Sequence, residues 1–211
     1  MTNLPGKAGT KGIPRARREQ QIIAAATREF GLRGYEGVSM AAIAEHVGVT
    51  KTLLHQYFGA KQDLYLACLT PIGDRLLAAM RSAMANSDTA LDIPLSVLCA
   101  VFTVLEGERE AWFVLYDTSL PLESEAAHAA EEYRASIDQL AATGSVDVLR
   151  GTGSTDPLDA DALKYVWRGL VTVLVRWWIR HPDQSPDAMV ERCRRLFAAA
   201  GMAFGQTPPS N

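Results

Sequence analysis

The chain has 211 residues, of which 48% are hydrophobic and 21% are charged. This composition is typical of a soluble globular protein and excludes the disordered, collagen-like and low-complexity classes. Three cysteines without a CxxC motif argue against a disulfide framework, and residues 1–14 lack the apolar segment of a secretory signal. We therefore expect a cytoplasmic protein whose cysteines lie in its core.

The formal net charge of −3 is unevenly distributed along the chain. Residues 1–70 hold nine Lys or Arg against five Asp or Glu, whereas the remaining 141 residues hold 12 basic and 19 acidic side chains. A basic head on an acidic body indicates a polyanionic partner. Residues 1–14, with Lys7 and Lys11, are predicted to form a disordered basic tail, for which a purely solubilising role is an equally good interpretation.

Helical periodicity dominates the sequence. Apolar residues recur at helical spacing and alternating runs are nearly absent, so we expect an all-α fold. Helices are predicted at residues 15–32, 40–47, 51–58, from 61 onward, 95–105, 109–117, 124–142, 163–179 and 188–204. Pro71 should kink or split the fourth helix, and residues 144–157, rich in Gly, Ser and Thr, should form a mobile loop.

Two short helices carry the clearest functional signal. Ser39 and Thr50 are suitable N-caps for them, and Gly48 turns the chain between them. On the second helix, one arc is polar and the opposite arc is largely apolar. The polar arc consists of Lys51, Thr52, His55 and Gln56. This arrangement predicts a helix-turn-helix whose second helix enters the DNA major groove, and a solvated amphipathic helix is the alternative.

The same residues resemble a known family. The segment GVSMAAIAEHVGVTKTLLHQYFGAKQDL, residues 37–64, is similar to the tetracycline-repressor (TetR) family signature. The match extends backwards through Arg18, Ile22, Ala25, Phe30, Gly34 and Tyr35. The resemblance implies an all-helical, homodimeric transcriptional regulator, usually a repressor and not an enzyme. Residues 15–60 would be the helix-turn-helix DNA-binding head, and residues 61–205 the helical ligand-binding and dimerisation body.

The resemblance also implies roles for single residues on double-stranded DNA. Residues expected to face the DNA are Thr50, Lys51, Thr52, His55 and Gln56, with Ser39 and Lys61 at phosphates and Tyr57 at the backbone. The chain departs from the family pattern at three positions. Leu53, His55 and Ala60 stand where the family often has Thr, Tyr and Ser. The first two affect base preference, and the third weakens a helix cap by about 1 kcal/mol.

The two closing helices are predicted to form a dimer interface. A narrow polar stripe that contains Lys164, Arg168 and Arg176 makes the first a poor membrane span and a helix buried on most of its circumference. Duplicated by a two-fold axis, the pair could form a four-helix interface. Its candidate residues are Leu170, Leu174, Trp177, Met189, Cys193, Leu196 and Phe197. The alternative is that both helices fill the core of their own monomer.

Aromatic residues between the head and the closing helices predict a pocket for a small-molecule ligand of largely apolar character. Its candidate contacts are Phe102, Arg109, Trp112, Phe113, Tyr116 and Arg168, with Met80 and Met84 nearby, and plain core packing is the alternative. A ligand would lower operator affinity by favouring a DNA-incompatible spacing of the two heads.

No catalytic signature accompanies these features. The chain lacks GxSxG, HExxH, GxGxxG and phosphate-loop motifs, and its four histidines show no metal-ligand spacing. We therefore expect no cofactor, no metal and no membrane association. A constitutive or architectural DNA-binding protein without an inducer is the alternative function, and a small helical enzyme a distant one.

Overall fold

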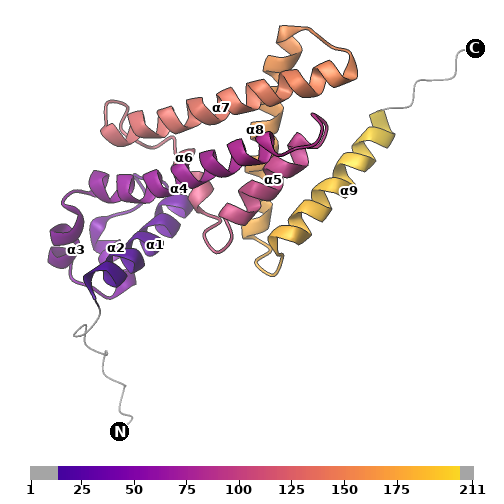
Figure 1. Cartoon of the computed structure of the whole chain (residues 1–211). Coiled ribbons are helices and arrows are strands. Elements are labelled where there is room, and N and C mark those ends of the chain that lie inside the picture. The colour runs from indigo at the N-terminus through magenta and orange to yellow at the C-terminus, as the bar shows by residue number, and fades with distance from the viewer. Residues whose placement is uncertain (1–13, 205–211) are drawn as a thin grey trace, which may run out of the picture.

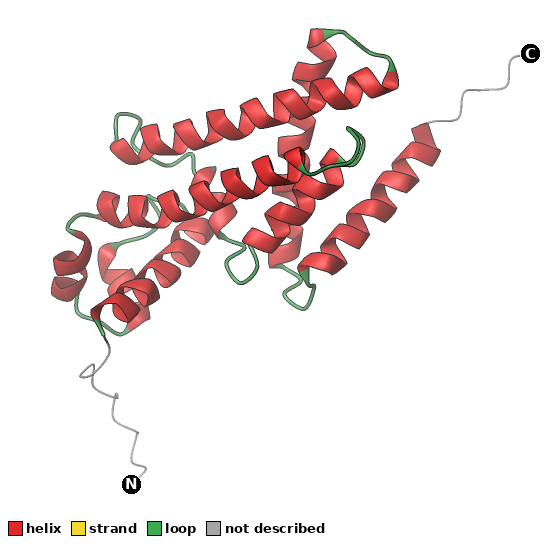
Figure 2. Ribbon diagram, in the orientation of Figure 1, coloured by secondary structure: helices red, strands yellow, loops and turns green. Residues whose placement is uncertain are grey.

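The computed structural model describes residues 14–204, and every regular element in that range is a helix (Figures 1 and 2). The helices are α1 (Arg15–Arg33), α2 (Met40–Val47), α3 (Lys51–Phe58), α4 (Lys61–Ala85), α5 (Ile93–Val104), α6 (Ala111–Leu115), α7 (Glu125–Thr152), α8 (Pro157–Ile179) and α9 (Pro186–Phe204). The expected all-α fold is therefore confirmed. The predicted basic tail, except residue 14, lies outside the described residues.

Local capping explains why α2 and α3 begin and end where the sequence predicts. The Ser39 hydroxyl oxygen accepts a hydrogen bond from the Ala42 N–H, and the Thr50 hydroxyl oxygen accepts one from the Leu53 N–H, both at 3.1 Å. These caps satisfy N–H groups that have no partner inside the helix. Gly48 ends α2 with φ 73° and ψ 34°, a left-handed conformation that favours glycine.

Helix α4 belongs to both parts of the molecule. Its first half packs against α1 and α3, and its second half packs against α5 and α7 (Figure 1). Pro71 lies inside this single helix instead of splitting it. Proline removes one backbone hydrogen bond from a helix. Buried Leu69, Ile72 and Leu76 on either side of Pro71 hold α4 in the core, which explains how the helix tolerates that loss.

Helices α4, α5, α7 and α8 build the core of the body, and α9 packs against α5 (Figure 1). Trp112 and Trp178 are its largest buried side chains. Trp178 meets Phe102 edge-on, with ring centroids 5.4 Å apart. Within residues 14–204, none of the helices combines the length and the apolar character that a bilayer span would require.

Helix α7 is longer than the sequence predicts. It continues to Thr152 through the segment that was expected to be a mobile loop. Gly144 and Ser145 are buried, and a Cβ added at Gly144 would lie 3.5 Å from Met84 and 3.6 Å from Ile93. Close packing of these small residues against α4 and α5 outweighs their low helix propensity. The extension adds nearly three turns to the predicted end of α7.

The cysteines behave as core residues. Cys68 and Cys193 are buried, and Cys99 is partly buried. Burial raises the pKa of the Cys68 thiol to about 12, so this group stays un-ionised and unreactive near neutral pH.

Candidate DNA-binding face and ligand cavity

Helix α3 presents a polar face to solvent. Lys51, Thr52, His55 and Gln56 are all exposed, whereas Leu54 on the opposite side is fully buried. Positions 51 and 55, like 52 and 56, lie four residues apart, so the four side chains share one side of the helix. A short helix with such a face fits the major groove and can address both base edges and phosphates.

The exposed His55 has a defined tautomer. Its Nδ1 lies 2.6 Å from the backbone oxygen of Gly59. A carbonyl oxygen can only accept a hydrogen bond, so Nδ1 must carry the proton. In the neutral ring, Nε2 is therefore an acceptor that is available to a partner outside the protein.

Two further predicted DNA contacts are partly buried. The Arg15 guanidinium lies over the Tyr57 ring at 5.2 Å, and the Lys61 ammonium lies over the Tyr35 ring at 4.1 Å. Burial lowers the pKa of Lys61. Ser39 and Thr50 are exposed at the N-termini of α2 and α3, where backbone N–H groups suit a phosphate. All eight predicted DNA-contact residues thus belong to the α2–α3 unit or to the start of α4.

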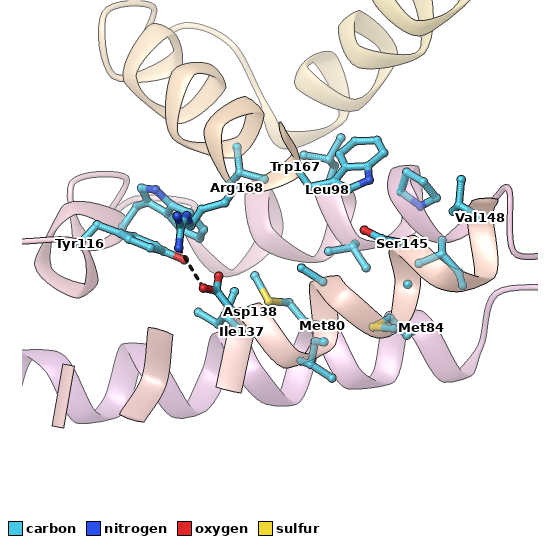
Figure 3. Close-up of a pocket in the computed structure, with 18 residues that line it drawn as sticks. Met80, Met84, Leu98, Tyr116, Ile137, Asp138, Ser145, Val148, Trp167 and Arg168 are labelled. Atoms are coloured by element: carbon cyan, nitrogen blue, oxygen red, sulfur yellow. Dashed lines mark hydrogen bonds and ion pairs between the residues drawn. The ribbon is translucent and has the colours of Figure 1, made fainter. Parts of the chain in front are cut away.

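A cavity in the body opens between α4, α5, α7 and α8 (Figure 3). The volume open to the centre of a water-sized sphere inside it is about 80 Å³. Most of its lining is apolar, and examples are Met80, Met84, Ile93, Leu98, Trp167 and Val171. Asp138 and Arg168 are the charged members of the described lining, and Arg168 donates a hydrogen bond of 2.9 Å to Asp138.

The structure brings only half of the predicted ligand contacts to this cavity. Trp112, Tyr116 and Arg168 line it. Phe102 instead packs on Trp178, and Phe113 lies beneath the Arg176 guanidinium. Arg109 is not a pocket residue either, because its guanidinium donates to backbone carbonyls of the α8–α9 turn.

The sequence does not predict much of the cavity wall. Helix α7 contributes Ile137, Asp138, Leu140, Ala141, Gly144, Ser145 and Val148. These residues recur at spacings of three and four, which is the pattern of one helix face. The periodic signal was therefore present, but the Gly and Ser content of the segment favoured a loop.

The predicted dimer residues divide into two groups. Leu174, Met189 and Cys193 are buried within the chain itself, since α9 packs against α5. Leu170, Trp177 and Phe197 are partly buried, and Leu196 is exposed. The apolar residues that α8 exposes are different ones: Leu158, Tyr165, Val166 and Val173. Three of the predicted interface residues therefore belong to the monomer core.

The cavity and the DNA-binding head are joined through α6, which packs against α1. Tyr116 at the end of α6 lines the cavity, and Asp117 follows it directly. The Asp117 carboxylate accepts from the Tyr35 N–H at 2.5 Å and from the Tyr65 hydroxyl at 3.2 Å. Burial and the neighbouring Asp117 carboxylate raise the pKa of Tyr65, so its hydroxyl remains a donor. The cavity residue Tyr116 is thus the direct chain neighbour of Asp117, which is hydrogen-bonded to the turn between α1 and α2.

Across residues 14–204, no group of three His, Cys, Asp or Glu side chains could hold a metal ion. A three-helix head with an exposed polar helix, carried on a helical body with an apolar cavity, defines a DNA-binding transcriptional regulator.

Comparison with known proteins identifies the family. Residues 22–68 match the family model described as "Bacterial regulatory proteins, tetR family". The transcriptional activator FasR of Mycolicibacterium smegmatis is 27% identical over 85% of this chain and 80% of its own length. The regulator BetI of Brucella anthropi is 30% identical over 47% of this chain and 53% of its own length.

A solved TetR-family regulator from Bordetella parapertussis has the same fold. It superposes with a TM-score of 0.71 at 22% identity, covering 85% of this chain and 93% of its own. The chain is therefore a transcriptional regulator whose residues 22–68 match the tetR family of bacterial regulatory proteins. Its relatives are regulators and not enzymes.

Proposed function

We propose that this protein is a homodimeric repressor that a small, largely apolar molecule releases from a palindromic operator. The observation that carries the proposal is an exposed polar recognition helix linked through α6 and α4 to an apolar cavity. Residues 15–60 form the DNA-binding head in this proposal, and residues 61–204 the ligand-binding and dimerisation body.

The head would bind DNA through α3. Lys51, Thr52, His55 and Gln56 face the major groove, and the N-termini at Ser39 and Thr50 meet phosphates, as do Lys61 and the Tyr57 hydroxyl. In its neutral form, the His55 Nε2 acceptor suits the exocyclic amine of adenine or cytosine. Base contacts would give specificity, whereas phosphate contacts would set orientation and salt dependence.

Release from DNA follows from linkage. A ligand lowers operator affinity only if it binds more tightly to a conformation whose heads do not fit the two half-sites, and DNA then weakens ligand binding by the same factor. Tyr116 and Asp117 connect the cavity wall to the turn before α2. A ligand that displaces the end of α6 would therefore move the head relative to the body.

Selection of bound sequences from random duplex DNA tests the DNA-binding part. We expect the wild type to recover a palindrome with half-sites about one DNA turn (34–36 Å) or a multiple apart. The Lys51→Ala/Gln56→Ala double variant should recover none, and loss of Lys51 alone should reduce the salt slope by about one unit. His55→Ala should relax the selection at one position in each half-site.

A matched double variant provides the control for this selection. Arg81→Ala/Gln139→Ala likewise removes one basic residue and one glutamine, here from exposed positions of α4 and α7. It should recover the wild-type palindrome. Equal retention of random DNA by the wild type and the Lys51→Ala/Gln56→Ala variant would contradict the assignment of α3. Transcription in vitro from a template that carries the palindrome should fall when the protein is added.

The dimer would form through the exposed apolar face of α8. Tyr165, Val166 and Val173 are 53%, 61% and 65% exposed, and on α9 Leu196 is 51% exposed. Exposed Gly169, with no atom within 4 Å of an added Cβ, would let a second helix approach closely. Burying apolar area of this kind stabilises a two-fold interface.

Light scattering tests the dimer directly. We expect twice the mass of one chain for the wild type, and a monomer for Val173→Arg because a buried unpaired charge opposes association. Leu122→Arg places the same charge at an 86% exposed position in the α6–α7 loop and should leave the dimer intact. A wild type that remains monomeric at micromolar concentration would contradict the proposed interface.

A further inference from the structure

Three buried polar atoms of the cavity wall lack a hydrogen-bond partner among the described residues. They are the Tyr116 hydroxyl, Asp138 Oδ1 and the Ser145 hydroxyl. A buried polar group without a partner costs about 1–3 kcal/mol, so such atoms are rare in folded proteins. Their concentration in one cavity indicates that a bound molecule supplies the missing bonds.

Two of these atoms lie at the same end of the cavity. Figure 3 shows Tyr116, Asp138 and Arg168 gathered there, with Ser145 further along α7. Burial and the nearby Asp138 carboxylate raise the pKa of Tyr116, so its hydroxyl keeps its proton and donates. Asp138 Oδ1 can only accept when the carboxylate is ionised. A ligand group that bonds to both atoms must accept one hydrogen bond and donate another.

Among the described lining residues, the charge at this end is balanced. Arg168 donates to Asp138 Oδ2 at 2.9 Å, and the remaining described lining carries no charge. A carboxylate entering beside this pair would leave a net negative charge in apolar surroundings, and an ammonium would leave a net positive one. Both are costly because an unpaired buried charge loses its hydration.

We propose that the cavity binds a neutral, mostly apolar molecule through a hydroxyl group, and discriminates against organic acids and amines of the same size. The hydroxyl accepts from Tyr116 and donates to Asp138, while the hydrocarbon part lies along α7 and α4. Ser145 lies seven residues, or about 10 Å, beyond Asp138 along α7 and offers a second bond to a ligand that reaches it. This inference rests on the proposed ligand-responsive function.

Three probes with one hydrocarbon chain and different head groups test the proposal: 1-decanol, decanoate and decylammonium. Calorimetric titration of the intact protein at neutral pH should show 1-decanol binding at least about tenfold more tightly than either ion. Trp112 and Trp167 line the cavity, so tryptophan fluorescence gives an independent measure of binding. 1-Decanol should also weaken binding to the selected operator.

Variants of the two head-group contacts make the test specific. Tyr116→Phe should weaken 1-decanol about fivefold, because the alcohol oxygen loses the phenol as its hydrogen-bond donor. Asp138→Asn leaves Arg168 without its carboxylate partner and should bring decanoate to at least the affinity of 1-decanol. Asp161→Asn, an exposed position on α8, is the matched control and should preserve the wild-type order.

The outcomes separate this inference from the function on which it rests. Decanoate or decylammonium binding as tightly as 1-decanol would overturn the neutral-ligand proposal and leave a ligand-responsive regulator. If no probe binds while the operator is still recognised, the cavity is not a ligand site, and the protein is a constitutive DNA-binding regulator. If Asp138→Asn does not fold, the response of Tyr116→Phe decides the proposal alone.

Discussion

Replacing Arg109 by alanine should lower the free energy of unfolding by about 3 kcal/mol, because one guanidinium holds the turn between α8 and α9. It donates to the Trp178 and His181 carbonyls at 2.9 and 3.2 Å, and to the Pro182 and Gln184 carbonyls at 3.0 Å each. The group also lies over the Trp178 ring at 4.0 Å. A positive charge is favourable there because the Trp178 carbonyl lies in the last turn of α8, the negative end of the helix dipole.

Urea unfolding followed by circular dichroism measures the effect. Arg109→Lys should show an intermediate loss, since an ammonium keeps the charge but cannot present the planar fork to four carbonyls. Arg180→Ala removes an exposed arginine beside the same turn and should change the unfolding free energy by less than about 0.5 kcal/mol. If Arg109→Ala unfolded at the same urea concentration as the wild type, Arg109 would not stabilise the α8–α9 turn.

The hydrogen bonds of Arg109 could not be predicted from the sequence. Its position among aromatic residues suggested a ligand contact, but its partners are backbone carbonyls some seventy residues away. Every residue carries the same backbone carbonyl, so no sequence pattern could identify these acceptors. The head is different, because each of its signals is local. Ser39 and Thr50 each accept a hydrogen bond from an N–H three residues ahead, and the four polar side chains of α3 share one face of the helix.

The body was predicted less well for two physical reasons. Gly144 and Ser145 have weak helix propensity, and only their packing against α4 and α5 makes the segment helical. Amphipathicity is the second reason. It indicates that one face of α9 is buried, but not which surface covers that face. Met189 and Cys193 were assigned to a partner chain, whereas they pack within their own chain.

Replacing Asp117 by alanine should have the largest effect on stability, a loss of about 4 kcal/mol, because four hydrogen bonds end on this buried carboxylate. Oδ2 accepts from the Tyr35 N–H and the Tyr65 hydroxyl, and Oδ1 accepts from the N–H and hydroxyl of Ser119 at 2.8 and 2.7 Å. Only the Tyr65 hydroxyl has an alternative acceptor, the Val114 carbonyl at 2.6 Å. The other donors would lose their partner.

The same carboxylate fixes the head on the body, so the variant should also bind the selected operator more weakly at temperatures where it remains folded. Asp117→Asn should be destabilised less, since its amide keeps one acceptor oxygen but turns an NH2 group toward donors. Asp88→Ala, in the exposed α4–α5 loop, should leave both measurements unchanged. Urea unfolding and operator titration distinguish the two roles. A variant that lost stability and kept wild-type operator affinity would show that Asp117 stabilises the fold without orienting the head, and α6 would then not be the path from cavity to DNA.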